Sequence, residues 1–61
     1  MSFTPEQTAK GILATISRGD WSLAASRLRA VPHDQTRAKV AAIVGKSLSA
    51  DELAVWRRYY S

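Results

Sequence analysis

A cluster of basic and aromatic residues lies near the end of the chain, where Arg57, Arg58, Tyr59 and Tyr60 follow one another. Guanidinium groups bind phosphate oxygens, and tyrosine rings can stack on unpaired bases. This combination is therefore typical of a surface that binds nucleic acid.

The charge of the chain points in the same direction. Its 61 residues include nine basic and five acidic side chains, which gives a net charge of +4. The excess is uneven, because residues 35–61 hold five of the basic and only two of the acidic side chains. We therefore predict a small basic regulator with a helix-turn-helix-like C-terminal half that binds DNA or RNA. The side chains expected to bind nucleic acid are Arg37, Lys39, Lys46, Arg57, Arg58 and Tyr59.

A protein-interaction module is the alternative, because acidic residues lie where a DNA-reading helix would approach the groove. Asp51 and Glu52 fall in the first turn of the last expected helix, and negative charge there repels phosphate. Val55 and Tyr59 are four residues apart and off the apolar stripe of that helix, so they are candidate exposed anchors for a protein interface. In this alternative the chain docks on a larger protein as a regulator or inhibitor, or it forms a homodimer. Between these two kinds of partner, the positive net charge of the chain favours nucleic acid.

Catalytic and metal-binding patterns are not found in the sequence. Residues 45–47 read Gly-Lys-Ser, like the end of a phosphate-binding loop, but Val40 stands where that loop requires a glycine. His33 adjoins Asp34 in an expected turn, where neighbouring side chains point apart. One histidine and no cysteine cannot supply the three or four ligands of a zinc site. We predict no enzymatic activity, no metal and no cofactor.

The elements that must position these residues are helices. Apolar residues recur at three- and four-residue spacing, and alternating strand-like runs are absent. We predict an all-α fold in a single domain, residues 1–61, as a small orthogonal bundle of three to four short helices. The expected helices cover approximately residues 5–18, 21–30, 35–45 and 50–60, after a short lead at residues 1–3.

One face of each expected helix is apolar and is predicted to be buried. The residues on these faces are Ala9, Ile12, Leu13, Ile16, Trp21, Ala24, Ala25, Leu28, Val31, Val40, Ile43, Val44, Leu48, Leu53, Trp56 and Tyr60. Thr15 is expected outside the first face.

Capping residues mark the ends of these helices. Four residues are predicted to cap helix starts: Thr4, Asp20, Asp34 and Ser49. Thr4 and Ser49 each have a glutamine or glutamate three residues later, which completes a capping box. Gly19 and Gly45 are predicted to end the first and third helices in the left-handed conformation that glycine adopts readily.

Three features of the sequence bear on the cellular location of the protein: the length of its apolar runs, the start of the chain and the absence of cysteine. The longest unbroken apolar run, residues 40–44, has five residues, whereas a membrane span needs roughly 20. The beginning of the chain lacks the pattern of a signal peptide, and the absence of cysteine fits a reducing compartment. We therefore expect a cytoplasmic protein with no membrane partner.

Overall fold

Four α-helices make up the computed structural model, which describes residues 4–60. They are α1 (Pro5–Ser17), α2 (Trp21–Arg29), α3 (Asp34–Lys46) and α4 (Ala50–Tyr60), and residues 4–60 contain no strand. The predicted small all-α bundle is confirmed, and each predicted helix end lies within one residue of the observed end. The predicted lead, residues 1–3, lies outside the described residues.

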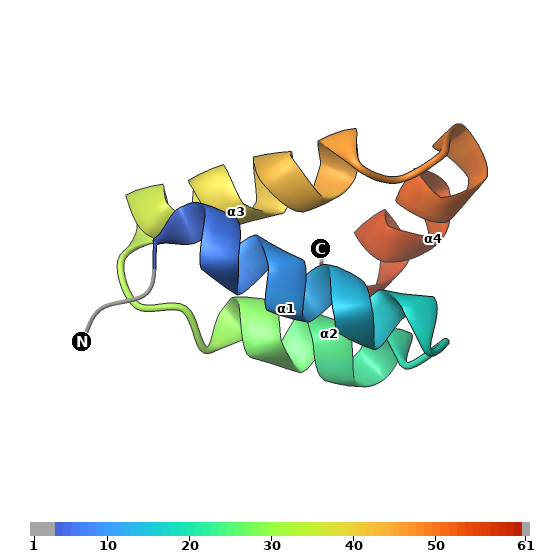
Figure 1. Cartoon of the computed structure of the whole chain (residues 1–61), viewed down its shortest axis with the longest axis horizontal. Helices are drawn as coiled ribbons and strands as arrows, with labels where there is room; N and C mark the ends of the chain where they lie inside the picture. Colours follow the sequence, from blue (N-terminus) through green and yellow to red (C-terminus); the bar gives the residue numbers. More distant parts are fainter. Residues whose placement is uncertain (1–3, 61) are drawn as a thin grey trace.

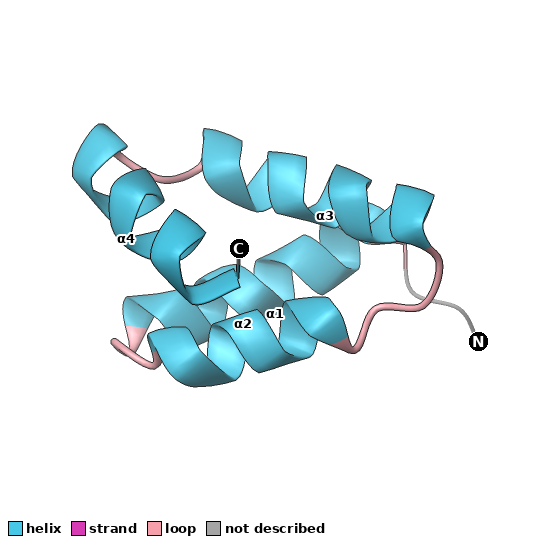
Figure 2. Ribbon diagram, turned by 180° about the vertical axis from the view of Figure 1, so that it is seen from behind, coloured by secondary structure: helices cyan, strands magenta, loops and turns pink. Residues whose placement is uncertain are grey.

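The first three helices run side by side along the longest dimension of the molecule, and α4 turns back across them (Figure 1). α1 packs against both α2 and α3, while α4 packs mainly on α2. Figure 2 shows from behind how α4 leaves the end of α3 and runs toward α2. Although α3 and α4 follow one another in the chain, they are therefore not a closely packed pair.

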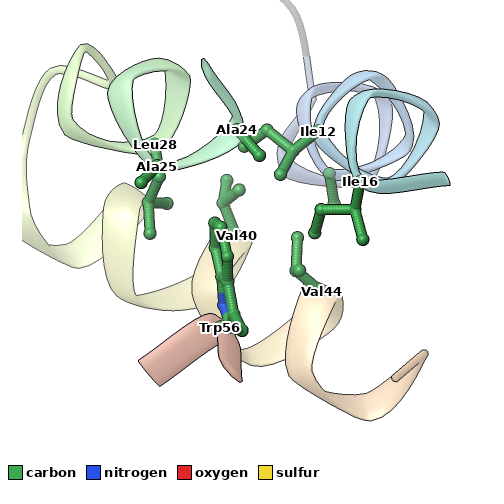
Figure 3. Packing of buried hydrophobic residues seen from close by; sticks show 9 residues of the cluster. Ile12, Ile16, Ala24, Ala25, Leu28, Val40, Val44 and Trp56 are labelled. Carbon is green, nitrogen blue, oxygen red and sulfur yellow. The ribbon is translucent and has the colours of Figure 1, made fainter. Parts of the chain in front are cut away.

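The core lies where the apolar faces of the four helices meet. Trp56 of α4 is fully buried, and Figure 3 shows its ring among side chains of the other helices, including Leu28 and Val40. The Trp56 ring centroid lies 4.9 Å from that of Tyr60 and 6.5 Å from that of Trp21. The buried core residues are Ala9, Ile12, Ile16, Ala24, Ala25, Leu28, Val40, Val44 and Trp56. Most of the predicted apolar faces are thus confirmed, with Leu13, Trp21, Ile43, Leu48, Leu53 and Tyr60 partly buried around this core.

Thr15 corrects the predicted face of α1, because its side chain is fully buried instead of lying outside. The hydroxyl donates a hydrogen bond of 3.0 Å to the carbonyl oxygen of Gly11, one turn earlier in the same helix. A threonine that bonds its own helix in this way has no need of water, so it can enter an apolar core.

Side-chain caps define three helix starts as predicted. In α1 the Thr4 hydroxyl accepts from the Gln7 amide at 3.2 Å, and the Gln7 side chain accepts from the Thr4 amide at 3.2 Å. The same reciprocal pair forms at α4, where the Ser49 and Glu52 bonds measure 3.2 and 3.0 Å. Asp20 caps α2 by accepting from the Leu23 amide at 3.3 Å.

Gly19 ends α1 as predicted, in the left-handed conformation with φ 80°. Its amide bonds to the carbonyl of Ile16 at 2.8 Å, and the next amide, of Asp20, bonds to the carbonyl of Thr15 at 3.2 Å. These two bonds form a Schellman motif, which satisfies carbonyls at the end of the helix.

Two capping roles predicted for α3 are wrong, although both of its ends lie within one residue of the prediction. Asp34 is the first helical residue rather than the cap, and His33 takes the cap position with φ 68° and no capping side-chain bond. The Asp34 carboxylate instead pairs with Arg37 at 2.9 Å. Gly45 does not end the helix either, because Lys46 is still helical and Ser47 follows in a right-handed conformation. Tighter bonds such as that from the Ser47 amide to the Val44 carbonyl, 3.1 Å, close the last turn without a left-handed residue.

Candidate functional site

An open hollow of about 500 Å³ lies between α3 and α4. Small residues of α3 form its floor, and side chains of α4 form its opposite wall. We call this hollow the α3/α4 groove; the residues that line it are Ala38, Ala41, Ala42, Gly45, Lys46, Leu53, Arg57 and Tyr60. It exists because α4 packs on α2 and because, apart from Lys46 at the edge, the α3 residues that line it have no atom beyond Cβ.

Gly45 lines the groove near the end of α3, next to Leu53 of α4. A Cβ atom on this residue would lie 3.4 Å from Cδ1 of Leu53, an ordinary van der Waals contact, so α4 comes close to α3 at this point. Glycine inside a helix lowers its stability by about 1 kcal/mol relative to alanine. The space beside Leu53 would also accept the methyl group of an alanine.

Two cations from different helices lie at the edge of the groove. Lys46 comes from the end of α3 and Arg57 from α4, and both are exposed. None of the described residues that line this hollow is acidic. Within residues 4–60 neither cation forms an ion pair, since the pair found there joins Arg37 and Asp34. The groove therefore combines an apolar floor with uncompensated positive charge at its edge.

A smaller hollow of about 220 Å³ continues the groove toward the start of α3. Ala38, Ala41 and Tyr60 line both hollows, and Leu28 adds an apolar wall to the smaller one. Together they form a depression that follows one face of α3 for most of its length.

Arg37 lies at the smaller hollow but its guanidinium already has partners. Nε and Nη2 donate to the carbonyl oxygen of Val31 at 3.2 and 3.1 Å, and Nη1 pairs with Asp34 at 2.9 Å. Arg37 therefore joins the segment after α2 to the start of α3, a structural task that leaves few of its donors for a ligand.

Tyr59 and Val55 lie off the groove, since neither lines it. They are exposed by 43% and 36%, as predicted for these two positions. One face of the Tyr59 ring stacks on Trp21, with centroids 6.3 Å apart and planes inclined by 19°. Arg29 of α2 donates a hydrogen bond to the carbonyl oxygen of Tyr59, which helps to hold the end of α4 on α2.

The six side chains predicted to bind nucleic acid are thus distributed over several surfaces. Lys46 and Arg57 come together at the groove, whereas Lys39 and Arg58 are exposed and do not line it. The groove itself was not predicted. Its signal in the sequence is the set of small residues at helical spacing beside the buried face of α3: Ala38, Ala41, Ala42 and Gly45.

Other kinds of site receive no support from the described residues. Residues 4–60 contain no group of three or more side chains placed to hold a metal ion. No helix within that range has the length and apolar character required to cross a bilayer. Comparison with known proteins found no matching family model, no matching curated protein and no matching solved structure. Functional assignment therefore depends on the geometry of this chain.

Proposed function

We propose that the chain is a non-catalytic protein-interaction module that binds its partner through the α3/α4 groove. The observation that supports this most is an apolar hollow between two helices that the chain's own side chains leave open. Binding sites of helical bundles often lie in hollows between their helices. Grooves between helices are a recurrent docking place for segments of other proteins.

The outward face of α4 favours this proposal over nucleic-acid binding. Asp51, Ala54, Val55 and Arg58 are exposed at helical spacing, so this face has one acidic, one basic and two apolar residues. Such a face offers phosphate no net attraction. The connection between α3 and α4 has a length common in helix-turn-helix units, but length alone identifies no DNA-binding surface.

The size of the domain gives a further reason to expect a partner. Chains below about 70–80 residues bury little surface, and their cores rarely contribute more than about 3–5 kcal/mol. A partner that binds only the folded chain adds stability by mass action. A partner bound in the groove would therefore also stabilise the folded chain.

A photo-crosslinking experiment tests the proposal. Benzoylphenylalanine replaces Ala42, which lines the groove, or Ala14, an exposed alanine on α1 that serves as the matched control. In cells of the native host, we expect a covalent protein adduct from position 42 and none from position 14. Equal adducts from both positions, or adducts with nucleic acid alone, would contradict the proposal.

Nucleic-acid binding remains the competing prediction, and salt dependence tests it separately. Labelled random duplex and single-stranded DNA are titrated with the protein at low and moderate salt, since phosphate-driven binding weakens steeply as salt rises. Replacing Arg57 and Arg58 by glutamine would then lower the salt slope by up to about 2, one for each lost phosphate contact. We expect no such salt-dependent binding if the groove is a protein site.

A further inference from the structure

We infer that the segment bound in the α3/α4 groove is an amphipathic α-helix with a narrow apolar face and acidic flanks. This inference rests on the proposed function and specifies the chemistry of the partner. It follows from three properties of the groove: the hydrogen bonding of its walls, the shape of its floor and the charge at its edge.

The walls favour a helix over an extended segment. An extended peptide gains its affinity by bonding its main chain to free backbone groups, as at the edge of a sheet. The walls here belong to α3 and α4, whose main-chain groups in mid-helix already bond within each helix. A buried peptide backbone without partners is strongly unfavourable. A helix avoids this, because it satisfies its own backbone before it docks.

The floor has the shape that a helix requires. Ala38, Ala41, Ala42 and Gly45 place no atom beyond Cβ on this face of α3, so a second helix can approach closely. The α3 residues that line the larger hollow lie between Ala38 and Lys46, and those that line the smaller one lie between Asp34 and Ala41, so the two hollows adjoin along α3. Side chains four residues apart on a bound helix are separated by roughly 6 Å. Two apolar anchors at i and i+4 of a bound helix that runs along α3 can therefore reach both hollows.

The charge at the edge selects an acidic partner. Lys46 and Arg57 are unpaired within the described residues, while the carboxylate at the smaller hollow, Asp34, is paired with Arg37. Glutamates or aspartates beside the apolar face of a bound helix would pair with these cations. Basic residues in the same places would be repelled. A second copy of this chain is a poorer occupant, since each copy has a net charge of +4.

The probe for this inference is a synthetic helical peptide of about 18 residues, long enough to be helical in water. It has leucines at i and i+4, glutamates on both flanks and alanine elsewhere. A second peptide replaces every glutamate by lysine, and a third has a central proline. Each is titrated into the full ¹⁵N-labelled chain, and amide chemical shifts and affinity are measured.

We expect the glutamate peptide to shift the amides of Ala41, Ala42 and Gly45, and to bind about tenfold more tightly than the lysine peptide. The proline peptide should bind more weakly than either. Replacing Lys46 and Arg57 together by glutamine should reduce the affinity for the glutamate peptide about tenfold, whereas replacing Lys39 and Arg58, which are exposed and do not line the groove, should leave it unchanged.

If the lysine peptide binds as tightly as the glutamate peptide or more tightly, the inference of an acidic partner is wrong. If the proline peptide binds as tightly as the glutamate peptide, the inference of a helical segment is wrong. Shifts confined to other surfaces would overturn both. These failures are separable from failure of the proposed function. An adduct specific to position 42 would show that a protein occupies the groove even if its segment is neither acidic nor helical.

Discussion

Removal of Trp56 tests the account of the fold most severely. Its side chain is fully buried in contact with the core, and the loss of a large aromatic side chain costs about 3–5 kcal/mol. A single core in a chain of 61 residues rarely supplies more than about 3–5 kcal/mol in total. Trp56→Ala should therefore remove about half of the free energy of unfolding or more, and leave much of the chain unfolded at room temperature.

The indole nitrogen gives this prediction a second part. Nε1 of Trp56 is buried and has no hydrogen-bond partner among the described residues. Trp56→Phe keeps an aromatic ring and removes this unsatisfied donor, so it should cost only about 1–2 kcal/mol. The loss in Trp56→Phe should therefore be clearly smaller than in Trp56→Ala.

Urea denaturation followed by far-UV circular dichroism measures both variants, and Trp21 remains as an independent fluorescent probe of α2. The reasoning is refuted if Trp56→Ala unfolds at the wild-type urea midpoint, which would place the indole at the surface. It is also refuted if Trp56→Phe is as damaging as Trp56→Ala. Coincident transitions by the two probes are required before midpoints are converted to free energies.

Three further substitutions test local features. Ser49→Ala should lower the free energy of unfolding by about 1 kcal/mol through loss of the α4 cap, and an unchanged urea midpoint would mean that α4 begins elsewhere. His33→Gly should raise it by about 1 kcal/mol, because φ 68° is unfavourable for a residue with a side chain; a lower melting temperature would contradict this. Arg37→Met should cost about 1 kcal/mol by removing the bonds to Val31, whereas Lys39→Met, an exposed control, should change the midpoint little.

Helix boundaries were predictable because the interactions that set them are local. The capping box of Ser49 and Glu52 spans three residues, and the Gly19 turn depends on the conformation of one residue. Such features can be recognised in a sequence without knowing which helices pack together. Thr15 was missed because a polar side chain predicts exposure, while its hydroxyl bonds to the carbonyl of the preceding turn.

The candidate site was less predictable because it depends on packing between distant segments. The groove forms only because α4 packs on α2 and leaves the small residues of α3 uncovered. The partners of Arg37 depend on the path of the chain between α2 and α3, which brings the Val31 carbonyl within 3.2 Å of its guanidinium. The apolar periodicity of a single helix shows neither how helices pack nor where the connecting chain runs. The predicted nucleic-acid-binding cations were therefore grouped by their positions in the sequence and not by the surface they share.

The most direct test of the groove compares two double variants with identical net charge. Lys46→Gln with Arg57→Gln removes the cations at the groove, and Lys39→Gln with Arg58→Gln removes two exposed cations that do not line it. The yield of protein adduct from the crosslinker at position 42 is measured in both backgrounds. We expect the groove pair to reduce the yield severalfold and the outer pair to leave it near wild type. An equal loss in both backgrounds would contradict the assignment, because it would show that binding follows total charge rather than the groove.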